Sequence, residues 1–200
     1  MVLHHVWGLF SHPKREWATI RNEPCTIGSC YLQHVLILAA IPALAGFIGA
    51  HQVGWRIAAG EAVRLTPLSA LLISLAFYAG MLTAVYVMGW LIHWMAHTYG
   101  AEPSIERCVV LAAYTATTLF LVGILVLYPL PWLNMLIGLP ALAYTVYLFY
   151  TGVPIVMGIP KEQGFLFSSA ALTGGMVLLV GLLAVSVILW SLGIGPVFTR

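Results

Sequence analysis

The chain has 200 residues, of which 62% are hydrophobic and only 7% are charged, and its formal net charge is +2. Soluble domains carry about 25% charged residues, so this composition excludes an ordinary soluble protein. The small net charge also gives no reason to expect nucleic acid as a partner. We therefore expect lipid to be the solvent for most of the molecule.

The first thirty residues are the most polar part of the chain. In "SHPKREWATIRNEP", Pro13 suits the first turn of a helix, and Glu16 suits the positive end of the helix dipole. Trp17 and Ile20 are three residues apart and share one face. The pattern predicts a short amphipathic helix that lies in the membrane interface and ends at Pro24. A plain polar tail and a helix that docks on a partner are the alternatives.

Five apolar runs follow, each long enough for a helix to cross a hydrocarbon core about 30 Å thick. Because backbone groups in lipid must be paired within their own segment, we expect helices rather than strands. The fold class is therefore all-α: a polytopic membrane protein with five transmembrane helices in one bundle, preceded by a short interfacial amphipathic helix. The predicted spans are approximately 31–50, 68–94, 109–128, 132–151 and 168–192.

The distribution of Lys and Arg predicts the orientation. With five spans, the termini lie on opposite sides of the membrane. A cytoplasmic N-terminus places five basic residues inside (Lys14, Arg15, Arg21, Arg107 and Lys161) and three outside (Arg56, Arg64 and Arg200). The positive-inside rule thus favours a cytoplasmic N-terminus and an outside C-terminus. This orientation puts Cys25, Cys30 and Cys108 on the reducing side, where we interpret them as small, semi-buried thiols.

No Glu, Lys or Arg lies inside a predicted span. Ion-coupled transporters usually keep an ionisable residue at membrane depth, so the pattern gives little support to that class. The polar groups within the spans are hydroxyls and amides, which usually join helices through hydrogen bonds. His34 and His51 flank the first span, and we expect both at the interface.

The strongest metal candidate in the sequence is the pair His93 and His97 in "HWMAH". A spacing of four places both imidazoles on one face of a helix, with Glu102 nearby. A structural or catalytic metal needs three or four ligands, so this pair is a weak candidate, and an interfacial position is the alternative. We identify no catalytic residue and no cofactor site, and we expect that the protein is not an enzyme.

The segment "YTGVPIVMGIPKEQGF", residues 150–165, interrupts the apolar pattern twice with Gly-x-Pro and then adds a Lys-Glu pair. A residue that precedes a proline is disfavoured in helical geometry. We therefore predict that the first Gly-x-Pro ends the fourth span, and that the rest forms a shallow cytoplasmic loop. The predicted structural and partner-surface residues on this side are Trp17, Arg107, Gly152, Pro154, Gly158, Pro160, Lys161 and Glu162.

Three stretches together resemble the Ypt-interacting-protein (Yip) family, in its bacterial inner-membrane branch. They are "HPKREWATI…EP" before the first span, "YGAEPSIERCVVLAAYTATTLFLVGIL", and "YPLPWLNMLIGLPALAYTVYLFYTGVPIVMGIPKEQGF". The family often has a proline shortly after the Ala-Tyr-Ser/Thr of the second stretch, where this chain has Thr117 and Thr118. The resemblance implies a cytoplasmic N-terminal segment (residues 1–30), a five-span domain (residues 31–200) and a location in the bacterial inner membrane. Eukaryotic relatives act in vesicle traffic with Rab-type GTPases, a role that bacteria lack, and no catalytic residue carries over.

Two functions remain open after the sequence analysis. The first is a non-enzymatic membrane scaffold or adaptor, whose partners are membrane lipids, a membrane or cytoplasmic protein, or a second copy of the chain. The alternative is a channel or transporter for a small solute or lipid, which would use the hydroxyl-lined spans and kinks at Pro42 and Pro140.

Overall fold

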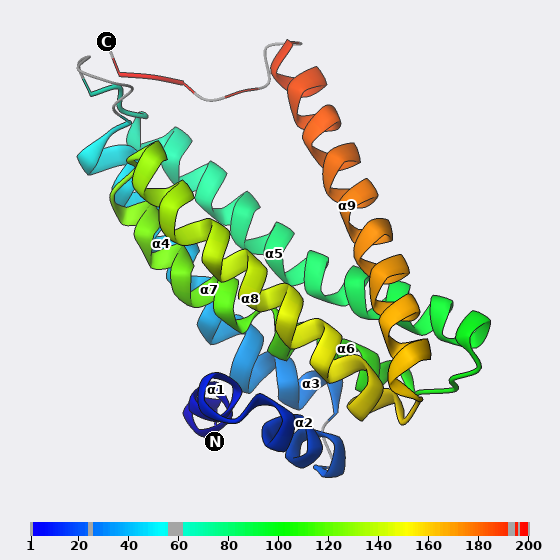
Figure 1. Cartoon of the computed structure of the whole chain (residues 1–200). Coiled ribbons are helices and arrows are strands. Elements are labelled where there is room, and N and C mark those ends of the chain that lie inside the picture. The colour runs from blue at the N-terminus through cyan, green and yellow to red at the C-terminus, as the bar shows by residue number, and fades with distance from the viewer. Residues whose placement is uncertain (1, 24–25, 56–61, 192–194, 196, 200) are drawn as a thin grey trace.

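The computed structural model describes residues 2–23, 26–55, 62–191, 195 and 197–199, most of which are helical. Figure 1 shows a bundle of long helices, with residues 2–23 at one end and residues 197–199 at the other. We call these the N-terminal end and the C-terminal end of the bundle. Two short helices at the N-terminal end, α1 (Val2–Ser11) and α2 (Pro13–Asn22), precede the first span.

Among the described residues, five helical units are long and apolar enough to cross a membrane, which confirms the predicted five-span, all-α fold. The first unit joins α3 (Ile27–Cys30), η1 (Tyr31–Val35), α4 (Leu36–Ile48) and η2 (Gly49–Val53), where η1 and η2 are π-helical. The second joins α5 (Pro67–Ala96) to the 3₁₀ turn η3 (His97–Tyr99). The third joins α6 (Ile105–Thr115), α7 (Thr117–Val122) and the 3₁₀ segment η4 (Gly123–Leu127). The fourth is α8 (Pro131–Met157) and the fifth is α9 (Lys161–Ser191).

Two prolines fix where long helices begin. Pro67 and Pro131 occupy the first turns of α5 and α8, where a missing N–H removes no helical hydrogen bond. Thr66 caps α5, because its hydroxyl accepts a bond from the backbone N–H of Ser69 at 3.4 Å. The sequence predicted both starts to within a residue.

The boundary between the fourth and fifth spans differs from the prediction. Helix α8 does not end at Thr151 but continues to Met157, and α9 begins at Lys161 rather than at residue 168. The predicted loop is therefore reduced to residues 158–160. The predicted end of the fifth span, residue 192, lies outside the described residues.

Helices α4 to α8 pack against one another, whereas α9 diverges from them. Figure 1 shows α9 next to α8 and α5 near the N-terminal end and separated from them toward the C-terminal end. Leu148, Phe149 and Phe167 are among the large side chains buried where α8 and α9 meet the rest of the bundle. The core is therefore concentrated toward the N-terminal end.

The third span is interrupted at Ala116, between α6 and α7, although this chain lacks a proline there. Thr117, the first residue after the break, is buried and shares a hydrogen bond with His34 (Oγ1 to Nε2, 2.8 Å). His34 lies in the π-helical turn η1, and only 1% of its surface is exposed. The prediction that His34 lies at the interface is therefore wrong, because the first helix begins at Ile27 and carries His34 into the bundle.

We predict that Thr117→Val lowers the free energy of unfolding by about 1–3 kcal/mol, because it leaves a buried imidazole nitrogen without its hydrogen bond. The neighbouring Thr118→Val is the matched control. Thr118 is equally buried, and its hydroxyl has no hydrogen-bond partner among the described residues. Unfolding of the purified variants in detergent measures both effects. Equal losses from the two substitutions would contradict this role for the His34–Thr117 bond.

Candidate functional site

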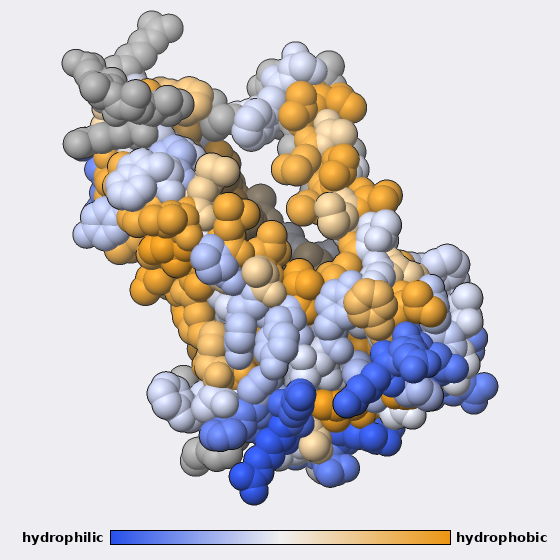
Figure 2. All heavy atoms as spheres, in the orientation of Figure 1, coloured by the Kyte–Doolittle hydropathy of each residue, from blue (hydrophilic) through white to orange (hydrophobic). Residues whose placement is uncertain are grey.

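Charged side chains gather at the N-terminal end of the bundle. Figure 2 shows the most hydrophilic atoms at this end, below a largely apolar body. Most of these side chains are exposed, and they come from four elements: α2, the segment before α6, α6 itself and α9. The exposed charged residues of this group are Lys14, Arg15, Arg21, Glu23, Glu102, Arg107, Lys161 and Glu162.

Trp17 joins α2 to this end of the bundle. Its side chain is completely buried, and α2 packs along α8. A Cβ atom added at Gly152 would lie 2.7 Å from the Trp17 ring and 2.9 Å from Leu111 Cδ1. Gly152 therefore provides the space for the indole, and any larger side chain there would displace it. Of the predicted structural and partner-surface residues, Trp17 is therefore a core residue that anchors α2.

The α2 helix differs in a second way from a helix lying free in the interface. Glu16 is buried and accepts a hydrogen bond from Nδ1 of His5 at 2.5 Å. His5 Nε2 also lies 3.2 Å from the Glu23 carboxylate. One imidazole therefore links α1 to both ends of α2. Sequence reasoning missed α1 altogether, and the predicted stop at Pro24 lies outside the described residues, α2 itself ending at Asn22.

The helices α8 and α9 are joined by a short turn at Gly158. Gly158 has φ +70°, the left-handed region that favours glycine, and its N–H bonds the Pro154 carbonyl at 3.1 Å. The structure corrects the predicted role of the first Gly-x-Pro, because Gly152 and Pro154 lie inside α8. The second Gly-x-Pro does end the helix, and Pro160 directly precedes α9. Lys161 and Glu162 lie in the first turn of α9 instead of in a loop.

Arg21 ties α2 to this turn. Its Nη1 donates a hydrogen bond to the carbonyl oxygen of Ile155 at 3.0 Å. The last carbonyls of a helix have no partner within the helix, so an arginine from a neighbouring element satisfies one of them here. The α2 helix, the end of α8 and the start of α9 thus form one connected unit.

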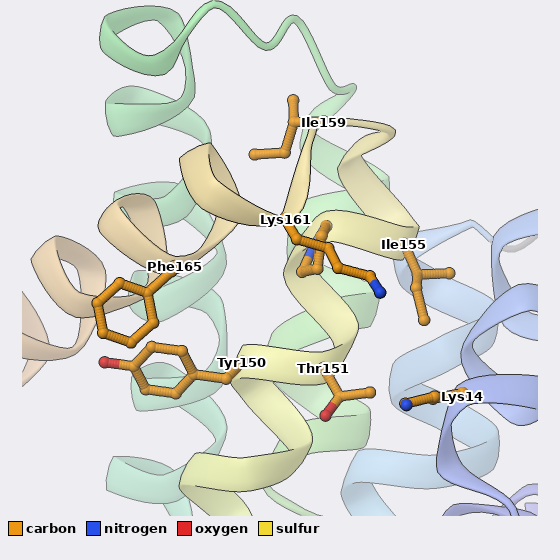
Figure 3. A pocket seen from close by; sticks show the side chains of 8 residues that line it. Lys14, Tyr150, Thr151, Ile155, Ile159, Lys161 and Phe165 are labelled. Atoms are coloured by element: carbon orange, nitrogen blue, oxygen red, sulfur yellow. The ribbon is translucent and has the colours of Figure 1, made fainter.

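A cavity of about 470 Å³ opens between α2, α8 and the start of α9. In Figure 3 the side chains of Lys14 and Lys161 extend toward the space beside Thr151 and Ile155. Phe165 forms one wall with Tyr150, whose hydroxyl bonds Ser169 Oγ at 2.8 Å. The residues that line the cavity are Lys14, Tyr150, Thr151, Pro154, Ile155, Ile159, Lys161 and Phe165. The cavity is therefore cationic at its mouth and apolar along its walls.

A buried polar column leads from α1 into the bundle. The His5 ring lies 5.5 Å from the Tyr114 ring, and the Tyr114 ring lies 4.3 Å from that of His34. His34 continues the column to Thr117. Sequence reasoning missed this column, because His5 precedes the predicted helix and His34 was assigned to the interface. The signal available in the sequence was that His34 lies inside the predicted first span, 31–50, directly before the apolar run that begins at Val35.

Three other predicted features lie apart from the cavity. His93 and His97 have ring centroids 5.6 Å apart, and His93 Nδ1 lies 3.1 Å from the Pro103 carbonyl oxygen. Among the described residues, no group of three or more His, Cys, Asp or Glu side chains is placed to hold a metal ion. Arg107 is exposed in the first turn of α6 and does not line the cavity.

The cysteines differ from the predicted semi-buried thiols. Cys30 and Cys108 are almost completely buried, with 2% and 0% of their surfaces exposed. Cys25 lies outside the described residues. The two buried thiols therefore belong to the core of the bundle. Because they are buried, thiol reagents added from either side of the membrane would not show on which side these cysteines lie.

Comparison with known proteins identifies relatives of this chain. The family model described as the Yip1 domain matches residues 7–183. The chain is 49% identical over 189 residues to inner membrane protein YohC of Escherichia coli strain K12, covering 94% of this chain and 97% of that protein. The protein of the same name from E. coli O6:H1 strain CFT073 matches with the same identity and coverage. No solved structure matches this chain.

We predict that Gly152→Ala lowers the free energy of unfolding by about 1–3 kcal/mol, because the added methyl group overlaps the Trp17 ring. The matched control in the same helix is Gly138→Ala, since a Cβ there meets nothing within 4 Å. Alanine is the better helix former, so Gly138→Ala is expected to be neutral or slightly stabilising. Thermal unfolding in detergent compares the two. If the variants unfolded at the same temperature, the Trp17–Gly152 contact would not hold α2 in place.

Proposed function

This chain belongs to the Yip1 domain family, and we propose that it is a non-enzymatic scaffold of the inner membrane that holds a protein partner at the N-terminal end of the bundle. One observation carries the proposal. Exposed side chains of both charges lie on a unit, formed by α2, the end of α8 and the start of α9, whose helices are held together by specific contacts. Trp17, Arg21 and the His5–Glu16 bond hold α1 and α2 in place. A charged surface on a preorganised support suits recognition of a partner, because little ordering is required on binding.

The alternative function, a channel or transporter for a small solute or lipid, relies on hydroxyl groups that line the spans. Many of these hydroxyls take part in hydrogen bonds within the protein. Three tyrosines bond carbonyl oxygens of other helices: Tyr31 with Leu82, Tyr78 with Leu36 and Tyr144 with Leu9. Four threonines, Thr83, Thr145, Thr151 and Thr173, bond the carbonyl one turn earlier in their own helix. This usage favours a role in joining helices, and so it supports the scaffold over the transporter.

Site-specific photo-crosslinking in living cells tests the scaffold. A photoreactive residue at Arg15 or at Glu162 probes the N-terminal end, and one at Val63 is the control at the C-terminal end. We expect a discrete protein adduct from the first two positions and none from Val63. The charge reversal Lys161→Glu with Glu162→Lys should reduce the adduct from Arg15 at least severalfold, because it alters the charge pattern while leaving the core intact. Adducts of equal yield from all three positions, or from none, would reject a partner at this end.

For the orientation, we propose that the N-terminal end faces the cytoplasm. Its described basic residues are Lys14, Arg15, Arg21, Arg107 and Lys161, whereas Arg64 is the described basic residue at the C-terminal end; Arg56 and Arg200 lie outside the described residues. This asymmetry agrees with the positive-inside rule.

The orientation is testable with new cysteines at exposed positions in a chain whose three native cysteines are replaced by alanine. We expect Val63→Cys to react with a membrane-impermeant maleimide in intact spheroplasts. Ala18→Cys should react only after the membrane is opened. The reverse labelling pattern would show that the N-terminal end faces outward.

A further inference from the structure

The cavity between α2, α8 and α9 is lined by two basic side chains and by mostly apolar ones. Lys14 and Lys161, from elements separated in the sequence by four spans, both line it. None of the residues that line it is acidic. Two lysine ammonium groups at one opening repel each other, and an anionic group between them is attracted to both.

The walls of the cavity are mostly apolar and suit a hydrocarbon group. Ile155, Ile159 and Phe165 contribute aliphatic and aromatic surface around the two lysines (Figure 3). The hydroxyl of Tyr150 is hydrogen-bonded to Ser169, and that of Thr151 donates to the Tyr147 carbonyl. The walls thus present mostly apolar surface, and the ligand that matches both parts is an amphiphile with an anionic head and an apolar tail.

The position of the cavity also favours an amphiphile that comes from the bilayer. It lies where α8 ends and α9 begins, at the level where charged residues replace the apolar surface of the bundle (Figure 2). Phe165 and its neighbour Leu166 are each 60% exposed, so one side of the cavity borders the lipid-facing surface of α9. A molecule can therefore enter from the bilayer with its head at the lysines and its chain beside α9.

We propose that this cavity binds the phosphodiester headgroup of an anionic glycerophospholipid. Lys14 and Lys161 contact the phosphate, and one acyl chain lies along Phe165 at the start of α9. Arg21 supports the site from outside, because its bond to Ile155 holds the end of α8 against α2. This inference goes beyond the scaffold function and does not depend on it, since the lipid site needs no protein partner.

The test measures lipid binding by the purified full chain in a neutral detergent, using native mass spectrometry with added phosphatidylglycerol or phosphatidylcholine. We expect phosphatidylglycerol to bind in preference to the zwitterionic lipid. A basic residue near an anionic lipid contributes about 1 kcal/mol, which corresponds to roughly fivefold in affinity. Lys14→Gln and Lys161→Gln should therefore each weaken binding roughly fivefold, and the double variant should weaken it by roughly 25-fold.

The matched control is Arg107→Gln, which removes an exposed positive charge at the same end but outside the cavity. It should leave phosphatidylglycerol binding unchanged within about twofold. Because all three residues are exposed, we expect the variants to fold, and their unfolding temperatures verify this. An equal loss of phosphatidylglycerol binding in Arg107→Gln would show that binding reflects general attraction between charges, and it would overturn the proposal.

Two competitors separate the lipid from a soluble phosphate. Inorganic phosphate and glycerol 3-phosphate carry the charge without the chain, so we expect neither to displace phosphatidylglycerol at equal concentration. Full displacement by either would identify a soluble-phosphate site and overturn the lipid assignment. Equal binding of phosphatidylglycerol and phosphatidylcholine would overturn it as well.

Discussion

The burial of Trp17 against Gly152 is the contact on which the N-terminal end of the molecule depends. The indole occupies space that exists only because α8 has no side chain at that position. With Trp17 in place, Arg21 reaches the end of α8, and Lys14 reaches the cavity beside α9. The charged residues of α2 would otherwise belong to a separate helix, without a defined position relative to α9.

Charge and burial are combined at this end in an unusual way. The His5–Glu16 pair, which joins α1 to α2, is buried. The neighbouring basic residues of α2, Lys14 and Arg15, are exposed. Buried polar pairs contribute little net stability compared with apolar packing, but they restrict the arrangements that a helix can adopt. The polar column through Tyr114 and His34 therefore orients α1, whereas the apolar contacts of Trp17 and Ile20 supply the stability that holds α2.

The fold was predictable from the sequence because five long apolar runs admit one structural solution in lipid. Their ends were less predictable. Pro154 suggested a helix end, but the helix continues through it to Met157, with its last turn packed against α2. Gly158 does end the helix, and the sequence could not distinguish the two Gly-x-Pro copies, since they share one pattern and only Gly158 adopts a positive φ.

The individual site residues were predicted less well than the region they occupy. Gly152, Pro154, Gly158 and Lys161 were chosen from the chain pattern. In the structure Gly152 lies against Trp17, Gly158 lies against Arg21, and Pro154 and Lys161 line the cavity. The contribution of Lys14 and the burial of Trp17 depend on how α2 docks, which is a tertiary contact between residues far apart in the chain. Amphipathic periodicity shows that α2 has an apolar face, but it does not show whether lipid or protein covers that face.

The helices α2 and α8 are far apart in the sequence although they pack together, and this has a consequence for biosynthesis. Arg21 and its acceptor Ile155 are 134 positions apart. At about 5–20 residues per second, α2 leaves the ribosome roughly 7–27 s before the end of α8 is made. During that interval the apolar face formed by Trp17 and Ile20 has no α8 to cover it, and the membrane interface is the nearest apolar surface. The amphipathic pattern thus suits α2 to remain at the membrane surface during synthesis, until α8 provides the space at Gly152 in which Trp17 packs.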